Sequence, residues 1–196
     1  ETFLVLNGDV LTDLDVRALV EFHYDVQAEA TIALQPVDDP SSFGVVTTDA
    51  RGRVEEFIEK PEKGSAPSNN INAGTYVLEP SVVEQIPQGR AVSVERETFP
   101  QLAASGTLYA LPSATYWLDT GTPQQFIQAN LDMLNGKRKQ VPQLPDAVID
   151  PKSLITQSVI GNGSEVEAGA IIDKSVVLDH CRIRVNSQVL GSVLSE

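Results

Sequence analysis

The C-terminal quarter of the chain repeats apolar residues at a spacing of six, and this period limits the fold more than any other feature. The series comprises Leu154, Ile160, Val166, Ile172, Leu178 and, after one interruption, Leu190. Small turn residues stand between these positions at Gly161, Gly163 and Gly169. Such a period is typical of a parallel β-helix built from hexapeptide repeats, and the alternative is a set of ordinary short strands.

The preceding residues, 1–139, alternate short apolar strands with amphipathic helices. Strands are expected at Phe3–Leu6, Ala30–Leu34, Gly44–Thr48, Val54–Ile58 and Asn72–Leu78. Helices are expected where Leu14, Ala18, Leu19 and Phe22 recur at helical spacing, and at Pro80–Ile86, Glu95–Ala104 and Pro123–Leu134. This mixture predicts a three-layer α/β domain. Residues 140–147 contain two prolines and are expected to link this domain to the repeats at 148–196.

The charge balance argues against a nucleic-acid partner, because the formal net charge is −13 and such a surface needs a basic stripe. Small molecules that carry phosphate stay compatible with this charge, since a site needs only a local cation or a metal. No apolar stretch approaches the roughly 20 residues of a membrane helix, so no membrane partner is expected. The single cysteine, Cys181, excludes an intramolecular disulfide and favours a reducing, cytoplasmic compartment.

Two acidic residues follow strand-like runs, one early and one late in the α/β region. Asp9 comes directly after "FLVLNG", and Asp119 ends "YWLD". The carboxyl end of a buried strand is a common ligand-binding position in α/β domains. Together the two carboxylates could hold Mg²⁺, which uses one or two protein carboxylates beside phosphate and water. The alternatives are a turn at Asp9 and a helix N-cap at Asp119.

The stretch "FIEKP" places a cation beside an acid at the end of another strand. Pro61 biases Lys60 toward an extended conformation, and the Lys60 ammonium would suit a phosphate as a point charge. Strand alternation would send Glu59 to the opposite side unless the strand bulges. The alternative is a solvated surface pair.

Small and amide residues mark a third candidate region. Gly74, after Ala73, leaves the backbone open to the close approach of a sugar or a second backbone segment. Asn72 offers both a donor and an acceptor to hydroxyls, and Gly44 has the same interpretation as Gly74. A β-bulge is the alternative at both glycines.

Six motifs in this order carry a family resemblance: "LNGD", "FGVV", "EKP", "INAGTYVLEP", "VERETFPQL" and "YWLDTGTP". They closely resemble the sugar-phosphate nucleotidylyltransferases, and most closely the mannose-1-phosphate guanylyltransferases. The resemblance implies a partial Rossmann-like nucleotidyltransferase sheet with helices, followed by a short left-handed β-helix. It also implies transfer of a nucleotide from a nucleoside triphosphate to a sugar 1-phosphate, with Mg²⁺ as cofactor and self-association into a homo-oligomer.

The resemblance assigns roles to individual positions. Asp9 and Asp119 match the Mg²⁺ ligands of the family, and Lys60 matches the lysine that meets the sugar phosphate. The positions matched to the sugar side are Gly44, Glu59, Asn72, Gly74 and Glu95. Alternatives at this stage are a glucose-1-phosphate thymidylyl- or uridylyltransferase and a non-catalytic regulatory homologue.

One family motif is missing from this sequence. The Gly-rich loop that cradles the triphosphate has no match here, so we expect it to precede Glu1 and expect this chain to be inactive alone. The run "FLVLNGD" would then be a buried, interior strand of the sheet. Two other classes fit less well: a metal-dependent glycosyltransferase would present Asp-x-Asp, and a hexapeptide acyltransferase would depend on His180.

Overall fold

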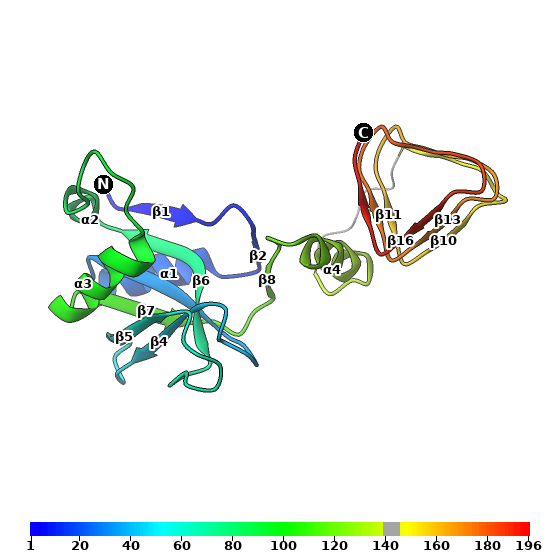
Figure 1. Cartoon of the computed structure of the whole chain (residues 1–196). Helices are drawn as coiled ribbons and strands as arrows, with labels where there is room; N and C mark the ends of the chain where they lie inside the picture. Colours follow the sequence, from blue (N-terminus) through cyan, green and yellow to red (C-terminus); the bar gives the residue numbers. More distant parts are fainter. Residues whose placement is uncertain (139–145) are drawn as a thin grey trace. The chain divides into compact units, whose positions relative to one another are not determined.

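The computed structural model describes residues 1–138 and 146–196, which form two compact units, Glu1–Trp117 and Leu118–Glu196. Each unit is described by itself below (Figure 1). The predicted linker, 140–147, lies largely outside the described residues. The predicted limits of the two domains, at 139 and 148, therefore stay a prediction.

The first unit is built on a mixed sheet. In the described residues this sheet has six strands, in the order β5 (Val54–Glu59), β4 (Gly44–Thr48), β6 (Asn70–Leu78), β3 (Ala30–Pro36) and β7 (Leu108–Pro112), with β1 (Phe3–Leu6) paired to β6. Strands β3 and β7 are parallel, whereas the pairs β1–β6, β3–β6, β4–β5 and β4–β6 are antiparallel. The predicted strands are therefore present, with ends that differ by a few residues.

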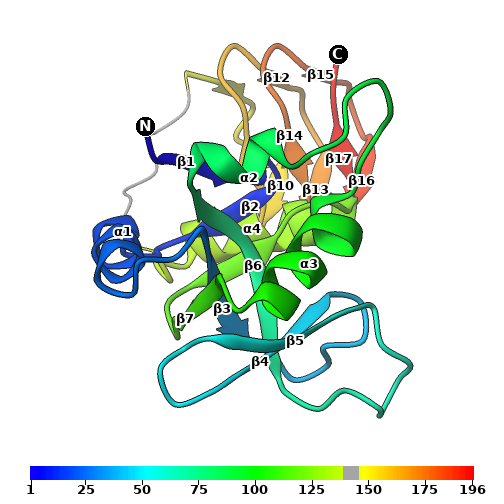
Figure 2. The same ribbon diagram turned by 90° about the vertical axis from the view of Figure 1, so that its left-hand side faces the viewer.

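Helices cover both faces of this sheet, as Figures 1 and 2 show. They are α1 (Val16–Asp25), α2 (Pro80–Glu84), the π-helical turn Val94–Thr98 and α3 (Phe99–Ser105). On one face Leu19 of α1 packs with Ala33 of β3. On the other face Ile32 packs in one cluster with Phe99 of α3 and Val82 of α2. Because neighbouring residues of β3 point to opposite faces, the three-layer α/β prediction is confirmed.

The prediction that Phe3–Leu6 is a buried strand is wrong in half of its residues. Phe3 and Val5 pack against the main core cluster, but Leu4 and Leu6 are 39% and 56% exposed. Side chains of a strand alternate between two faces. The described residues cover the Phe3–Val5 face of β1, and an apolar run therefore does not imply burial of every residue in it.

The second unit combines one helix with short parallel strands. Helix α4 spans Pro123–Leu134, as predicted, and the Thr122 hydroxyl caps it by accepting from the Gln125 N–H. The strands are β9 (Val148–Ile149), β10 (Leu154–Thr156), β11 (Val159–Ile160), β12 (Glu165–Val166), β13 (Ile171–Asp173), β14 (Val176–Val177), β15 (Arg182–Ile183), β16 (Gln188–Leu190) and β17 (Val193–Leu194). They form three parallel sheets, β9–β12–β15, β10–β13–β16 and β11–β14–β17. This arrangement is consistent with a β-helix.

The structural repeat of the second unit is 17 residues long, one residue shorter than three hexapeptides. Paired residues stand 17 apart, as in Ile155, Ile172 and Val189. The buried residues of its core include Ile160, Val166, Ile172, Val177, Ile183 and Val189. Their spacings are six, six, five, six and six. The predicted six-residue series is therefore wrong at Leu154, Leu178 and Leu190, which are 59%, 38% and 56% exposed, because one segment of each 17-residue repeat is five residues long.

Two remaining strands are β2 (Val10–Thr12), which begins directly after Asp9, and β8 (Trp117–Asp119), which ends with Asp119. The Trp117 indole N–H donates to the Ala73 carbonyl oxygen at 2.9 Å, which ties the end of the first unit to the centre of its sheet. Within residues 1–138 and 146–196, no helix has the length and apolar character needed to cross a membrane.

Candidate sugar-phosphate site

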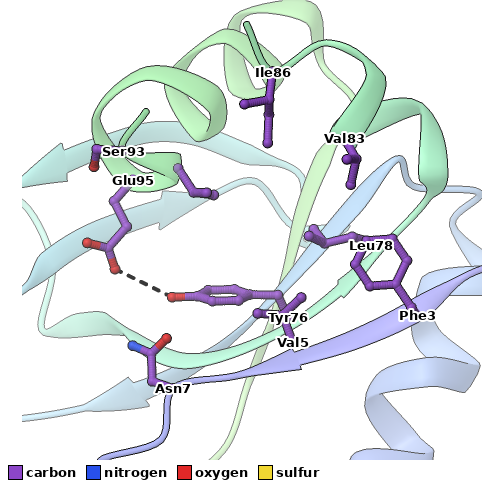
Figure 3. A pocket seen from close by; sticks show the side chains of 10 residues that line it. Phe3, Val5, Asn7, Tyr76, Leu78, Val83, Ile86, Ser93 and Glu95 are labelled. Atoms are coloured by element: carbon purple, nitrogen blue, oxygen red, sulfur yellow. Dashed lines mark hydrogen bonds between the residues drawn. The ribbon is translucent and has the colours of Figure 1, made fainter. Parts of the chain in front are cut away.

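A cavity of about 410 Å³ opens beside β1, β6 and the π-helical turn (Figure 3). Its lining is Phe3, Val5, Asn7, Tyr76, Leu78, Val83, Ile86, Ser93, Val94 and Glu95. Polar groups gather at the end where Asn7, Tyr76 and Glu95 lie, and Phe3, Leu78 and Val83 lie at the other end. The cavity therefore combines an apolar wall with one acidic, hydrogen-bonding end.

The structure joins two predicted site residues, Asn72 and Glu95, directly. The Asn72 amide Nδ2 donates to Glu95 Oε1 at 2.7 Å and to the Tyr76 hydroxyl at 2.9 Å. The Tyr76 hydroxyl in turn lies 3.4 Å from Glu95 Oε1 (Figure 3). Sequence reasoning missed Tyr76. Its position four residues after Asn72 in one strand was the available signal, because even spacings place side chains on one face.

Glu95 stands on a π-helical turn, where one α-helix was predicted from Glu95 to Ala104. The Ser93 hydroxyl accepts from the Arg96 N–H at the start of this turn, and α3 begins only at Phe99, with Pro100 in its first turn. Proline is tolerated at the first position of a helix, where its missing N–H costs no hydrogen bond. The segment therefore splits into two short helical pieces, and π-helical turns are frequent at functional sites.

Gly74 lies at an irregularity of β6, where its pairing with β3 shifts register. Its φ of +73° is left-handed, and a Cβ there would lie 2.8 Å from Asn7 Nδ2. The Gly74 N–H donates to Asn72 Oδ1 at 3.0 Å, and the Gly74 carbonyl accepts from the Asn7 N–H at 2.8 Å. The β-bulge interpretation and the close-approach interpretation therefore both hold, and Asn7 is the group that approaches.

Gly44 keeps the space beside Glu59 open. The two residues pair across β4 and β5, and a Cβ on Gly44 would lie 3.1 Å from Glu59 Oε2 and 2.8 Å from Phe57 Cζ. Glu59 Oε2 is buried, and within the described residues no hydrogen-bond partner meets it. Burial raises the pKa of Glu59, as does the nearby charge of Glu95, while Lys60 opposes the shift. Buried polar atoms without a hydrogen-bond partner are few in folded proteins, and Glu59 Oε2 therefore needs an explanation.

The structure corrects the expectation for Lys60. Its φ is +51°, left-handed rather than extended, although Pro61 follows. The Lys60 N–H donates to the Phe43 carbonyl at 3.0 Å, which closes the end of the β4–β5 hairpin. Lys60 Nζ also lies 4.0 Å from Glu59 Oε1, so the expected separation of these side chains to opposite faces is wrong. The turned backbone ends the alternation of β5 at Glu59.

The two predicted metal ligands lie in different units. Asp9 is exposed in the turn between β1 and β2, and Asp119 ends β8, where its Oδ1 accepts from the Gly121 N–H at 2.7 Å. Thr122, not Asp119, caps α4, so the N-cap alternative for Asp119 is wrong. Carboxylate oxygens of this kind fit Mg²⁺, which completes its shell with phosphate and water. Joint binding of one ion by both residues stays a prediction.

The first unit thus combines a mixed α/β sheet with an acidic residue after β1 and a lysine beside a half-buried glutamate. Residues 1–136 match the family described as Nucleotidyl transferase, and the chain belongs to this family.

Three relatives of this chain are each named as a mannose-1-phosphate guanylyltransferase or its catalytic subunit. The chain is 40% identical to a mannose-1-phosphate guanylyltransferase of Mycobacterium tuberculosis, over 93% of this chain and 54% of that protein. It is 36% identical to mannose-1-phosphate guanylyltransferase 1 of Arabidopsis thaliana, over 93% of this chain and 53% of that protein. It is 40% identical to the mannose-1-phosphate guanylyltransferase catalytic subunit beta of Drosophila melanogaster, over 74% of this chain and 38% of that protein. The chain spans about half the length of the first two.

Proposed function

We propose that the protein carrying this chain transfers a nucleotide from a nucleoside triphosphate to a sugar 1-phosphate and releases pyrophosphate. The proposed pair is GTP and mannose 1-phosphate, with GDP-mannose as product. Membership of the nucleotidyl transferase family and the names of the relatives support this choice. Glucose 1-phosphate with dTTP or UTP is the alternative pair.

The observation that carries the proposal is that Glu59 Oε2 is buried with no hydrogen-bond partner among the described residues, while Glu59 Oε1 lies 4.0 Å from Lys60 Nζ. A sugar hydroxyl would donate to Oε2 and satisfy it. The Lys60 side chain is 59% exposed, against 15% for Glu59, so the cation can reach a phosphate while the acid faces the sugar. Charge-assisted hydrogen bonds of both kinds are stronger than neutral ones.

The proposed reaction needs no activated side-chain nucleophile. A phosphate monoester has its second pKa near ~6, so the sugar phosphate is largely dianionic at neutral pH. One of its oxygens attacks the α-phosphorus of the triphosphate, and the bond to the departing pyrophosphate breaks. Lys60 holds the attacking phosphate and offsets its charge. Asp9 and Asp119 would hold Mg²⁺, which when bound neutralises phosphate oxygens.

Further proposals concern the second unit and the setting of the protein. We propose that its parallel strands form a left-handed β-helix and that this part mediates a homo-oligomer. We also propose a cytoplasmic location, which the single cysteine, Cys181, favours. Analytical ultracentrifugation of the protein with and without residues 146–196 tests the oligomer.

The decisive experiment measures pyrophosphate release by the full-length protein with Mg²⁺. Mannose 1-phosphate and glucose 1-phosphate are each offered with GTP, dTTP, UTP and ATP. Asp9→Asn and Asp119→Asn should each lower turnover at least about 100-fold, as loss of charge stabilisation does elsewhere. Asp25→Asn removes an exposed carboxylate and is the matched control. If no substrate pair gives pyrophosphate release, the transferase proposal is overturned. Normal turnover of both Asp variants overturns the assignment of Asp9 and Asp119 as metal ligands.

A further inference from the structure

We propose that Asn72 and Tyr76 are positioning residues that hold Glu95, and that Glu95 Oε2 is the carboxylate oxygen offered to the sugar. This inference rests on the proposed function. It replaces the sequence-based role of Asn72, which was a direct contact with sugar hydroxyls. Three observations carry it, one for each member of the hydrogen-bonded group.

The first observation is that the Asn72 amide is fully engaged within the chain. Its Oδ1 accepts from the Gly74 N–H at 3.0 Å, so the backbone fixes which end of the amide is the oxygen. The NH₂ end has two hydrogens, and its partners are Glu95 Oε1 at 2.7 Å and the Tyr76 hydroxyl at 2.9 Å. Asn72 is only 7% exposed. It therefore has no donor left for a ligand and acts through Glu95.

The second observation concerns the direction of the Tyr76 hydroxyl. This hydroxyl accepts from Asn72, which leaves its own hydrogen to point at Glu95 Oε1, 3.4 Å away. Burial raises the pKa of Tyr76, and the charge of Glu95 adds to the shift, against the hydrogen bond from Asn72. The phenol therefore stays protonated and a donor. Its ring packs against Phe99 with centroids 5.1 Å apart, which keeps the hydroxyl in place.

The third observation is that both donors meet the same oxygen of Glu95. The hydrogen bonds that the described residues make to this carboxylate end on Oε1. Glu95 lines the cavity, where its carboxylate faces Tyr76 (Figure 3). The charge of Glu95 also raises the pKa of Glu59, so a second carboxylate lies within electrostatic range of Glu95. Two nearby acceptors suit a ligand rich in hydroxyl donors, as a sugar is.

The test measures the affinity of the full-length protein that carries this chain for mannose 1-phosphate and for inorganic phosphate by isothermal titration calorimetry. The variants are Tyr76→Phe, Asn72→Asp, Glu95→Gln and the double variant Tyr76→Phe/Glu95→Gln. Asn72→Asp keeps the acceptor for Gly74 but removes both donors. The matched control is Tyr24→Phe, which removes the hydroxyl of a residue that is 58% exposed.

We expect Tyr76→Phe to weaken mannose 1-phosphate binding about 3- to 10-fold, the value of one hydrogen bond, and Asn72→Asp to weaken it more. Inorganic phosphate binding should not change, since Lys60 is untouched. In the Glu95→Gln background, Tyr76→Phe should cause no further loss, because two residues that act through one contact are not additive. Thermal unfolding of each variant separates this coupling from a loss of fold.

Additive losses in the double variant, or full affinity in both Tyr76→Phe and Asn72→Asp, overturn the inference while leaving the proposed function standing. Absence of mannose 1-phosphate binding by the unaltered full-length protein overturns the proposed function and, with it, this inference.

Discussion

Lys60 Nζ lies 4.0 Å from Glu59 Oε1, although these residues are neighbours at the end of a strand. Alternation along β5 would send them to opposite faces of the sheet. The left-handed backbone at Lys60, with φ +51°, brings them to one side instead. Strained backbone of this kind costs on the order of 1–3 kcal/mol and gathers at functional sites. The pairing of a cation with a half-buried acid is thus a product of that turn.

Lys60→Gly should separate stability from binding. Glycine adopts positive φ without strain, so the free energy of unfolding should rise by about 1 kcal/mol. The loss of the ammonium should weaken mannose 1-phosphate binding by about tenfold or more, as loss of a charged hydrogen bond does. Denaturant unfolding and calorimetric titration check the two effects. The control is Lys63→Ala, which removes a cation whose side chain is 85% exposed and should change neither stability nor binding. Unchanged mannose 1-phosphate binding in Lys60→Gly would show that Lys60 is only a surface charge.

Glu59→Gln should change how stability depends on pH. The pKa of Glu59 is raised in the folded protein, chiefly by burial and then by Glu95. The folded chain therefore binds more protons than the unfolded chain between the two pKa values, and stability falls as pH rises through that interval. The variant lacks this loss, so its advantage should grow as pH rises above the ordinary glutamate value of about 4.3. Thermal unfolding from pH 4 to pH 8 measures the stability difference between the variant and the unaltered protein, with Glu56→Gln at an exposed position as control. A difference that does not change with pH contradicts the raised pKa of Glu59.

Gly74→Ala should cost more stability than Gly64→Ala. Both glycines have left-handed φ, +73° and +83°, so both substitutions carry the same backbone penalty of about 1–2 kcal/mol. A Cβ at Gly64 meets nothing within 4 Å, whereas one at Gly74 meets Asn7 Nδ2 at 2.8 Å. The difference between the two unfolding free energies therefore measures the contact with Asn7. Adding Asn7→Gly should recover part of it, and equal costs at both glycines would show that Asn7 simply moves aside.

Val177→Ala should destabilise the second unit more than Leu178→Ala does, although leucine is the larger residue. Val177 is fully buried and Leu178 is 38% exposed. The valine substitution should cost about 2 kcal/mol through lost burial and a cavity. The leucine substitution should stay near 0.5 kcal/mol, roughly the usual effect at a surface. Denaturant unfolding monitored on this unit measures both costs. A strict six-residue period would bury Leu178 in place of Val177, so a larger cost for Leu178→Ala would contradict the 17-residue repeat.

The periodic features of the fold could be predicted from the sequence. Helix α4 has the predicted ends, and strand β4 spans Gly44–Thr48 as expected. Both follow from local spacing of apolar residues and from residues such as Pro123 and Gly44 that begin an element. The types of group that we propose for the site, a lysine, acids and an amide, were also visible in the sequence, because each stands next to a strand end or a glycine.

The sequence by itself thus determined the α/β class, the existence of a repeating C-terminal part and the chemical kinds of side chain that we propose for the site. Only the tertiary structure decided that Asn72 and Tyr76 share Glu95, because residues 23 and 19 positions apart meet through strand register and a π-helical turn. It also decided the turn of Lys60, where the bond to the Phe43 carbonyl overrides the local preference set by Pro61. Local patterns specify elements, whereas hydrogen bonds between distant segments specify which side chains meet.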